Sequence, residues 1–280
     1  MRRLWLAGGI LAVAVTALAL RPADPPPLRF VLLGDRTGET QPGVWQQVWK
    51  DIAADDPAFV VGAGDSIQGG NDESAESEWR EVERGLAPSA KIPLYLAPGN
   101  HDIWSPLSER LFTKYTHHPL HYSFDRGPLH FTVLDDSRSD ALPHDEFAFL
   151  EADLREHPAQ PFKFVVSHRP SWILDAALRN TNAQLHVLAK KYGVQYMVAG
   201  HVHQIIHTDL DGVTYLCLPS AGGHLRASEK YEDGWFFGYI VATIEGKSIR
   251  MQVKELGPPH GKGRTNDVSD WGLTGLAVRR

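Results

Sequence analysis

Residues 196–203 read YMVAGHVH, an apolar run that ends at Gly200 and leads into two histidines separated by one residue. This pattern is typical of a buried strand that presents side chains at its carboxyl end. His201 and His203 alone would be a weak indication of a site, because exposed strands often carry two histidines. The pair gains weight because four other apolar runs of the chain also lead into polar residues.

Those four runs are followed by residue types that bind metal ions. They cover residues 30–34, 59–64, 94–99 and 164–167, and they lead into Asp35, Asp65, Asn100-His101-Asp102 and His168. Because open α/β sheets place ligands at the carboxyl ends of their strands, we expect these side chains to converge. Carboxylate, amide and imidazole groups without thiolate suit Mn, Fe or Zn. Two such ions about 3.5–4 Å apart, sharing a carboxylate, would generate a hydroxide and hold a phosphoryl group.

The composition of the 280-residue chain is that of a globular protein, with 42% hydrophobic residues, 22% charged residues and a formal net charge of −6. This length allows one large α/β domain or two small ones. The acidic balance argues against a nucleic-acid partner, which would favour a basic surface. Cys217 is the only cysteine and lies in the apolar stretch 213–218, so we expect no intramolecular disulfide and a buried, unreactive thiol.

The first 27 residues differ from the rest. Arg2 and Arg3 precede an apolar run over residues 4–20, and a proline-rich segment follows. These features predict either a secretory signal peptide or an uncleaved N-terminal membrane anchor. The folded part would then be exported, in the periplasm or outside the cell, or anchored to the membrane through this segment alone. We expect one domain over residues 28–256, followed by a loosely ordered tail over residues 257–280.

Helices and strands alternate in the first half of the chain. Helical spacing of apolar residues predicts helices over residues 44–54, 74–86, 105–115, 143–157 and 181–192. Period-two patterns predict antiparallel hairpins over residues 121–134, 204–218 and 239–253. An α/β (α+β) fold with two mixed β-sheets packed face to face and helices outside accommodates both halves.

The residues at the five strand ends resemble the motifs of the calcineurin-like metallophosphoesterase superfamily. In order, the family motifs are GDxH, GDxx, GNH[DE], a lone histidine after a strand, and GHxH. Here they read GDRT at 34–37, GDSI at 64–67, GNHD at 99–102, SH at 167–168 and GHVH at 200–203. Each motif is weak individually, but five in the family's order are a specific signal. The resemblance implies a four-layer sandwich and a phosphoesterase with a dinuclear centre of divalent or trivalent ions (Mn, Fe or Zn).

The resemblance also implies roles for the matched residues. Asp65 would bridge both metals, and the other ligands would divide between them: the first ion would take Asp35 and His203, and the second Asn100, His168 and His201. A metal-bridging hydroxide would attack phosphorus in line.

His101 would not bind metal but would act as general acid beside the leaving group, oriented by Asp102 or a neighbouring carboxylate. Arg36 and Arg169 directly follow ligand residues. Each is expected either to contact the phosphate through two guanidinium N–H groups or to form a surface salt bridge. His224 follows another strand end and is a further candidate for the pocket wall.

One position departs from the family pattern, since Thr37 stands where a histidine is common. A threonine hydroxyl is a poor ligand for a transition ion, so three alternatives are open. Either water completes the coordination, or Gln68 or Asn71 replaces the missing ligand, or the first metal binds weakly.

We therefore expect a metal-dependent phosphoesterase acting on a small-molecule or protein phosphoester. The alternative is a metal-binding domain of the same fold with a binding or regulatory role and weak or no turnover, because of Thr37. The sequence does not indicate the oligomeric state. Other polar residues are expected at the surface, among them His186. Asp135-Asp136 ends a strand, so it is expected in a solvated turn or, as the alternative, beside the metal ligands.

Overall fold

The structure is a computed structural model that describes residues 27–226 and 230–273. The predicted signal or anchor over residues 4–20 lies outside these residues. Among the helices of the described part, none combines the length and apolar character needed to cross a bilayer. The first strand begins at Arg29, one residue after the expected start of the domain.

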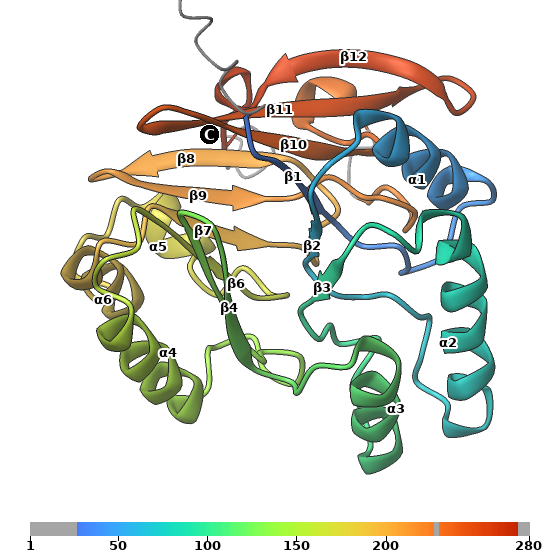
Figure 1. The fold of residues 1–280 in the computed structure, drawn as a ribbon, viewed down its shortest axis with the longest axis horizontal. Coiled ribbons are helices and arrows are strands. Elements are labelled where there is room, and N and C mark those ends of the chain that lie inside the picture. Colours follow the sequence, from blue (N-terminus) through green and yellow to red (C-terminus); the bar gives the residue numbers. More distant parts are fainter. Residues whose placement is uncertain (1–26, 227–229, 274–280) are drawn as a thin grey trace, which may run out of the picture.

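One six-stranded sheet has the order β12-β11-β10-β1-β2-β3. Its strands are β1 (Arg29–Leu33), β2 (Val60–Gly62), β3 (Leu94–Leu96), β10 (Gly238–Glu245), β11 (Ser248–Gly257) and β12 (Gly261–Asp267). The strands β1, β2 and β3 are parallel, whereas β10 runs antiparallel to β1. The helices on its outer side are α1 (Val44–Asp55), α2 (Asp72–Leu86) and α3 (Pro106–Thr116) (Figure 1).

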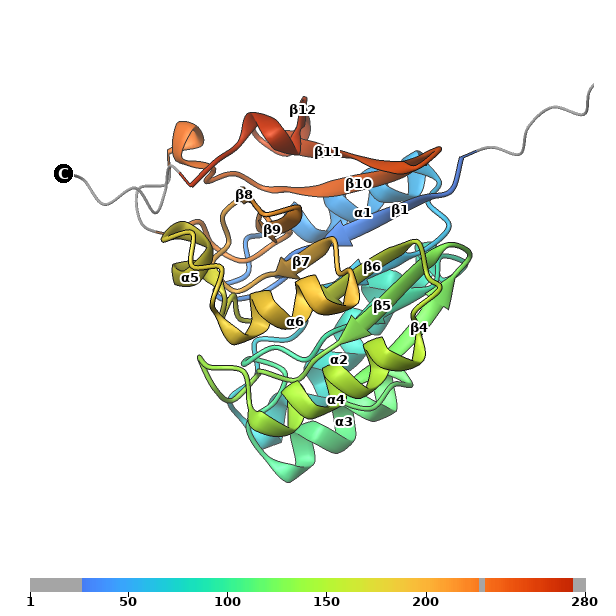
Figure 2. The same ribbon diagram turned by 90° about the vertical axis from the view of Figure 1, so that its left-hand side faces the viewer.

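The second sheet, also of six strands, has the order β4-β5-β6-β7-β9-β8. Its strands are β4 (Tyr122–Arg126), β5 (Leu129–Val133), β6 (Phe162–Val166), β7 (Tyr196–Ala199), β8 (Ile206–Leu210) and β9 (Val213–Cys217). The helices α4 (His144–Glu156), α5 (Ile173–Ala177) and α6 (Gln184–Tyr192) lie on its outer side (Figure 2). Three short 3₁₀ helices complete the described part: η1 (Ala87–Ser89), η2 (Tyr231–Asp233) and η3 (Val268–Asp270).

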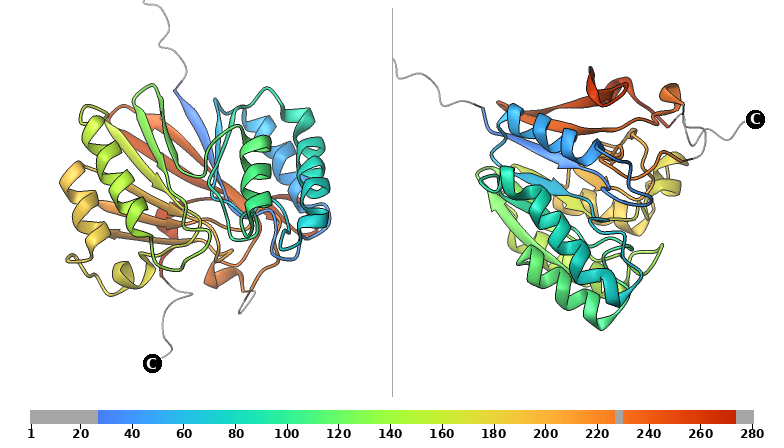
Figure 3. Two further views of the ribbon diagram at one scale, coloured as in Figure 1. Left: turned by 90° about the horizontal axis from the view of Figure 1, so that it is seen from below. Right: turned by 90° about the vertical axis from the view of Figure 1, so that its right-hand side faces the viewer.

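The two sheets pack face to face through buried aromatic rings. Phe30 of β1 stacks on Phe59 at 5.1 Å, and its ring meets Phe131 of β5 and Phe164 of β6 edge-on at 5.6 and 5.5 Å. Each such ring removed from water contributes roughly 1.5–3 kcal/mol. The alternate residues of β1, Val31 and Leu33, face the other way, into a second cluster with the side chains of α1. Alternate residues of the strand thus face either the other sheet or the helices. The result is a helix–sheet–sheet–helix sandwich (Figure 3), which confirms the predicted fold class.

The expected loose tail is wrong over residues 257–273. Strand β11 continues to Gly257, and β12 pairs with it antiparallel, with Gln252 opposite Asp267. The side chains of β12 are mostly exposed, so the strand lacks the apolar alternation by which strands are detected. Backbone hydrogen bonds to β11 order it instead, and residues 274–280 lie outside the described part.

Candidate metal centre

All six predicted metal ligands come together at the carboxyl ends of strands. They lie just beyond β1, β2, β3, β6 and β7, and are Asp35, Asp65, Asn100, His168, His201 and His203. Four of them, Asp35, Asp65, His168 and His203, have no exposed surface. Burial of several ionisable groups side by side is unfavourable unless a cation compensates for the charge.

The donors form two groups that share one carboxylate. Asp65, His168 and His201 place one ligand atom each within 4.8 Å of one another, and Asp35, Asp65 and His203 do the same. The amide oxygen of Asn100 lies 3.0 Å from His168 Nε2 and therefore joins the first of these groups. Asp65 stands where a bridging ligand between two ions would have to be.

Hydrogen bonds outside the centre orient the two buried imidazoles. His168 Nδ1 lies 2.8 Å from the carbonyl oxygen of Ala63, and His203 Nδ1 lies 2.7 Å from that of His224. With Nδ1–H donating to a carbonyl, Nε2 carries the free lone pair and faces the carboxylates. Metal-bound histidines are commonly held in this way.

Two buried atoms in the centre lack a hydrogen bond within the described residues, namely Asp65 Oδ2 and His203 Nε2. Each has only a longer contact of 3.3 Å, from Asp65 Oδ2 to His168 Nε2 and from His203 Nε2 to Asp35 Oδ2. A buried polar atom without a hydrogen bond costs about 1–3 kcal/mol. An acceptor from a carboxylate and a lone pair from an imidazole are ligands for the same kind of ion, so the donor set fits Mn, Fe or Zn.

Electrostatics point to the same conclusion. Burial lowers the pKa of His168, but the charge of Asp65 outweighs it and raises the pKa to about 10. Burial and the charges of His168 and Arg169 lower the pKa of His201 to about 4. The cluster thus favours one positive charge beside Asp65, and a proton there would leave when a metal binds.

The backbone adopts unusual conformations to bring the ligands in. Asp65, His201 and His203 have φ angles of 56°, 66° and 60°, a region that costs non-glycine residues about 1–3 kcal/mol each. Gly99 in GNHD allows a close approach, because a Cβ there would lie 2.2 Å from Asp65 Oδ1. These costs are typical of a functional site.

His101 lies beside the centre, but Asp102 does not orient it as expected. The His101 Nδ1 atom is 2.6 Å from the backbone oxygen of Gln68, so this carbonyl fixes the ring. The buried Asp102 carboxylate instead accepts hydrogen bonds from the backbone of Ser66 (2.8 Å) and Gly99 (2.9 Å). Burial and the charge of Asp65 raise the Asp102 pKa to about 7. Asp102 therefore braces the loops after β2 and β3.

The Arg36 guanidinium group contacts a loop and α2, as the salt-bridge alternative predicted. Its guanidinium group donates to the carbonyl oxygen of Ser66 (2.9 Å) and to Glu81 of α2 (2.7 Å), and lies over the ring of Trp45. The residue is 7% exposed, and burial lowers its pKa. The salt-bridge alternative is the one found, although it is buried on the arginine side rather than at the surface.

Arg169 stays close to the centre. It forms an ion pair with the exposed Asp140, and its charge contributes to the lowered pKa of His201. Asp136, which we expected in a solvated turn, is buried and accepts from the backbone N–H groups of His168 (2.9 Å) and Arg169 (3.0 Å). The sequence signal for this role was its position near a strand end, three residues after β5.

Thr37 is buried and engaged with Gln68. Its hydroxyl donates to the Gln68 side-chain oxygen (2.6 Å), which also accepts from the backbone of Glu39. Asn71 caps the N-terminus of α2 with its side-chain oxygen, so it does not serve as a replacement ligand. The group formed by Asp35, Asp65 and His203 thus has three protein donors, while the other has four.

The structure also gives the positions of three residues for which the sequence led to an expectation. His186 is buried and bonded to the hydroxyl of Tyr215 at 2.8 Å, so its predicted surface position is wrong. The contribution of His224 to the centre is its backbone oxygen, which holds His203. Cys217 is fully buried and burial raises the pKa of its thiol, which confirms the prediction of an unreactive side chain.

Sequence comparisons place these motifs in a known context. A family model described as calcineurin-like phosphoesterase matches residues 28–205. The 3',5'-cyclic adenosine monophosphate phosphodiesterase CpdA of Escherichia coli (strain K12) is 29% identical over 205 residues, 68% of this chain and 69% of that protein. The protein of the same name from Haemophilus influenzae is 27% identical over 228 residues, 75% of this chain and 80% of its own length.

Comparison with solved structures agrees on the fold. Purple acid phosphatase PPD1 from yellow lupin seeds has a TM-score of 0.63 with this chain at 16% identity. The match covers 93% of this chain and 58% of the lupin protein, so the chain spans less than two thirds of that neighbour. At this identity the likeness concerns the fold alone.

Proposed function

Since the chain belongs to the calcineurin-like phosphoesterase family, we propose that it is a metal-dependent hydrolase of phosphate esters. The observation that carries this proposal is the pair of donor groups that share Asp65, with His101 beside them. The family match extends over all five motifs. A pure binding domain has no need for a proton donor at that place.

Two bound ions would supply charge against the phosphoryl oxygens and lower the pKa of a water molecule. Asp65 would be a ligand of both ions, Asp35 and His203 would hold one of them, and Asn100, His168 and His201 would hold the other. The carboxylate orientations are fixed by backbone N–H groups, with His101 N at 2.8 Å from Asp65 Oδ1 and His201 N at 3.0 Å from Asp35 Oδ1.

The proton for the leaving group comes from His101 in this proposal. Because Nδ1–H donates to the Gln68 carbonyl, a protonated ring offers its second proton at Nε2. As the bond from phosphorus to the ester oxygen breaks, this proton moves to that oxygen and prevents an alkoxide from forming. The new bond to phosphorus comes from the water oxygen, and the proton released by the water restores the imidazolium. We also propose that Arg169, whose charge acts on His201 and whose partner Asp140 is exposed, binds a phosphoryl oxygen.

We propose Mn, Fe or Zn as the metals, and cyclic nucleotides and small phosphomonoesters as the substrates to test first. Two of the relatives are named as phosphodiesterases of cyclic adenosine monophosphate, and a fold neighbour is named as a phosphatase. The acidic net charge gives no reason to include nucleic-acid polymers.

The test measures metal content and hydrolysis in the same preparation of the purified chain. We expect two ions per chain, and turnover that chelation removes and Mn, Fe or Zn restores, with Asp65→Asn as the inactive control.

One observation favours a second candidate, a binding or regulatory domain: one metal group has three protein donors because Thr37 is paired with Gln68. Metal content without turnover on either substrate class would favour that candidate.

The location of the protein is a separate proposal. The basic and apolar character of residues 2–20 supports export or anchoring, and membrane contact only through that segment. Cell fractionation followed by N-terminal sequencing of the product distinguishes a cleaved signal from an anchor, and a cytoplasmic product with an intact N-terminus would contradict both.

A further inference from the structure

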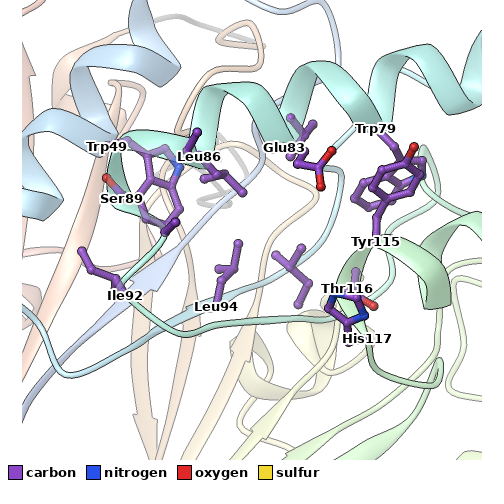
Figure 4. A pocket seen from close by; sticks show the side chains of 14 residues that line it. Trp49, Trp79, Glu83, Leu86, Ser89, Ile92, Leu94, Tyr115, Thr116 and His117 are labelled. Carbon is purple, nitrogen blue, oxygen red and sulfur yellow. The ribbon is translucent and has the colours of Figure 1, made fainter.

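A cavity of about 430 Å³ lies among the outer helices, apart from the metal centre. Its wall is formed by α1, α2, η1, β3 and the end of α3, and none of the six metal ligands lines it (Figure 4). The edge strand β3 forms its floor through Leu94 and Leu96. The volume is within the range of pockets that bind small organic molecules.

The inner wall is apolar and aromatic but contains two unused hydrogen-bond donors. Trp49 and Trp79 are 4% and 2% exposed, and within the described residues their indole N–H groups have no partner. In Figure 4 the nitrogen of Trp49 lies on the ring edge that faces Leu86, another residue of the cavity wall. Burial of an indole N–H without an acceptor costs about 1–3 kcal/mol. A ligand that offers an acceptor would recover this cost.

The rim of the cavity carries a carboxylate without a partner. Along α2, Glu76 pairs with Lys114 and Arg80, and Glu81 pairs with Arg36. Glu78 accepts from the backbone of the loop before the helix. The carboxylate of Glu83, which lines the cavity, has no hydrogen bond or ion pair within residues 27–226 and 230–273. A positively charged group at the rim would complement it.

We propose that this cavity binds a small amphipathic cation with a flat apolar body and a hydrogen-bond acceptor. The body lies between Trp49 and the stacked rings of Trp79 and Tyr115, which are 5.8 Å apart. The acceptor meets an indole N–H, and the cationic end reaches Glu83. Aromatic walls favour such a ligand, because they bury a planar body without losing many side-chain rotamers.

Calorimetric titration of the full chain with serotonin tests this proposal. Serotonin has an indole body, a hydroxyl acceptor and an ammonium group, and hydroxyindoleacetate is the matched probe of opposite charge. We expect saturable binding of serotonin and at least about fivefold weaker binding of hydroxyindoleacetate. Glu83→Gln should weaken serotonin binding about two- to fivefold, as expected for a partly exposed ion pair. Glu73→Gln, on the same helix and away from the cavity, should leave it unchanged.

Two further variants test the position of the ligand. Leu86→Trp fills the hollow, and Ala90→Leu narrows it from an exposed position that tolerates a larger side chain. Each should weaken serotonin binding more than tenfold while thermal unfolding and phosphoester hydrolysis stay as in the parent. Lack of saturable binding by the parent chain, equal affinity for the two probes, or undiminished binding in both folded variants would overturn the proposal.

Discussion

Replacement of His101 by alanine should separate chemistry from metal binding. The backbone N–H of His101 donates to Asp65 Oδ1 at 2.8 Å, and this bond does not depend on the side chain. The imidazole itself contacts the Gln68 carbonyl and none of the metal-facing atoms of Asp65. We therefore expect His101→Ala to keep its full metal content and its fold.

The size of the effect follows from the role of the ring. General acid catalysis by a positioned side chain contributes about 10²–10⁴-fold in rate, which corresponds to about 2.7–5.4 kcal/mol of transition-state stabilisation. This loss applies to substrates whose leaving oxygen needs a proton. Nitrophenolate is a stable anion, so nitrophenyl phosphate should lose far less than an alkyl phosphate.

The assay compares kcat for alkyl and nitrophenyl esters in the parent and in His101→Ala, with metal content measured on each sample. His144→Ala removes an exposed histidine at the start of α4 and serves as the matched control. Alkyl-ester turnover within twofold of the parent would refute the general-acid role. Loss of metal from His101→Ala would show instead that the ring belongs to the ligand set.

Three further predictions concern other parts of the molecule. Asp65→Asn should retain less than about one ion per chain after dialysis, measured by mass spectrometry of the metals, because both donor groups use this carboxylate. Thr37→Val should lower stability by about 0.5–1.5 kcal/mol through loss of the bond to Gln68, whose side-chain oxygen still accepts from the Glu39 backbone. Metal content should be unchanged, and loss of metal from the folded variant would identify Thr37 as a ligand. Denaturant unfolding should show that the buried pair His130–Asp153 contributes to stability only between a lower and an upper pH. Burial alone would lower the His130 pKa, but hydrogen bonds to Asp153 and to a second carboxylate raise it. Burial alone would raise the Asp153 pKa, but the hydrogen bond to the His130 imidazole lowers it. The histidine contribution should be complete below its ordinary pKa of 6.5 and decline as pH rises through the raised value. The aspartate contribution should be complete above 3.8 and decline as pH falls through the lowered value. His130→Gln should remove the decline above pH 6.5, and an unchanged profile would contradict this assignment.

Much of the site could be predicted from the sequence, because the ends of buried strands show a pattern within a few neighbouring residues. An apolar run followed by a small residue and then a ligand residue is a feature of neighbouring residues. Five such runs, four ending in glycine and one in Ser167, predicted the candidate ligands that the structure brings together. The face-to-face sheets were predicted from the alternation of helices and strands in the first half of the chain and the antiparallel hairpins in the second. The structure agrees, since alternate residues of β1 belong to different cores. The strand β12 escaped detection, because its order depends on backbone pairing with β11 rather than on its own side chains.

The sequence by itself determined which residue types follow the strands, and so the chemistry of the centre. Only the tertiary structure decided what each polar neighbour contacts. Asp102 and Arg36 are adjacent to ligand residues along the chain, yet their side chains brace loops and α2. Gln68 orients His101 through a backbone oxygen, which any residue type could provide. A side chain's partner is set by long-range packing, often of residues more than thirty positions apart, and adjacency in sequence carries no information about that packing.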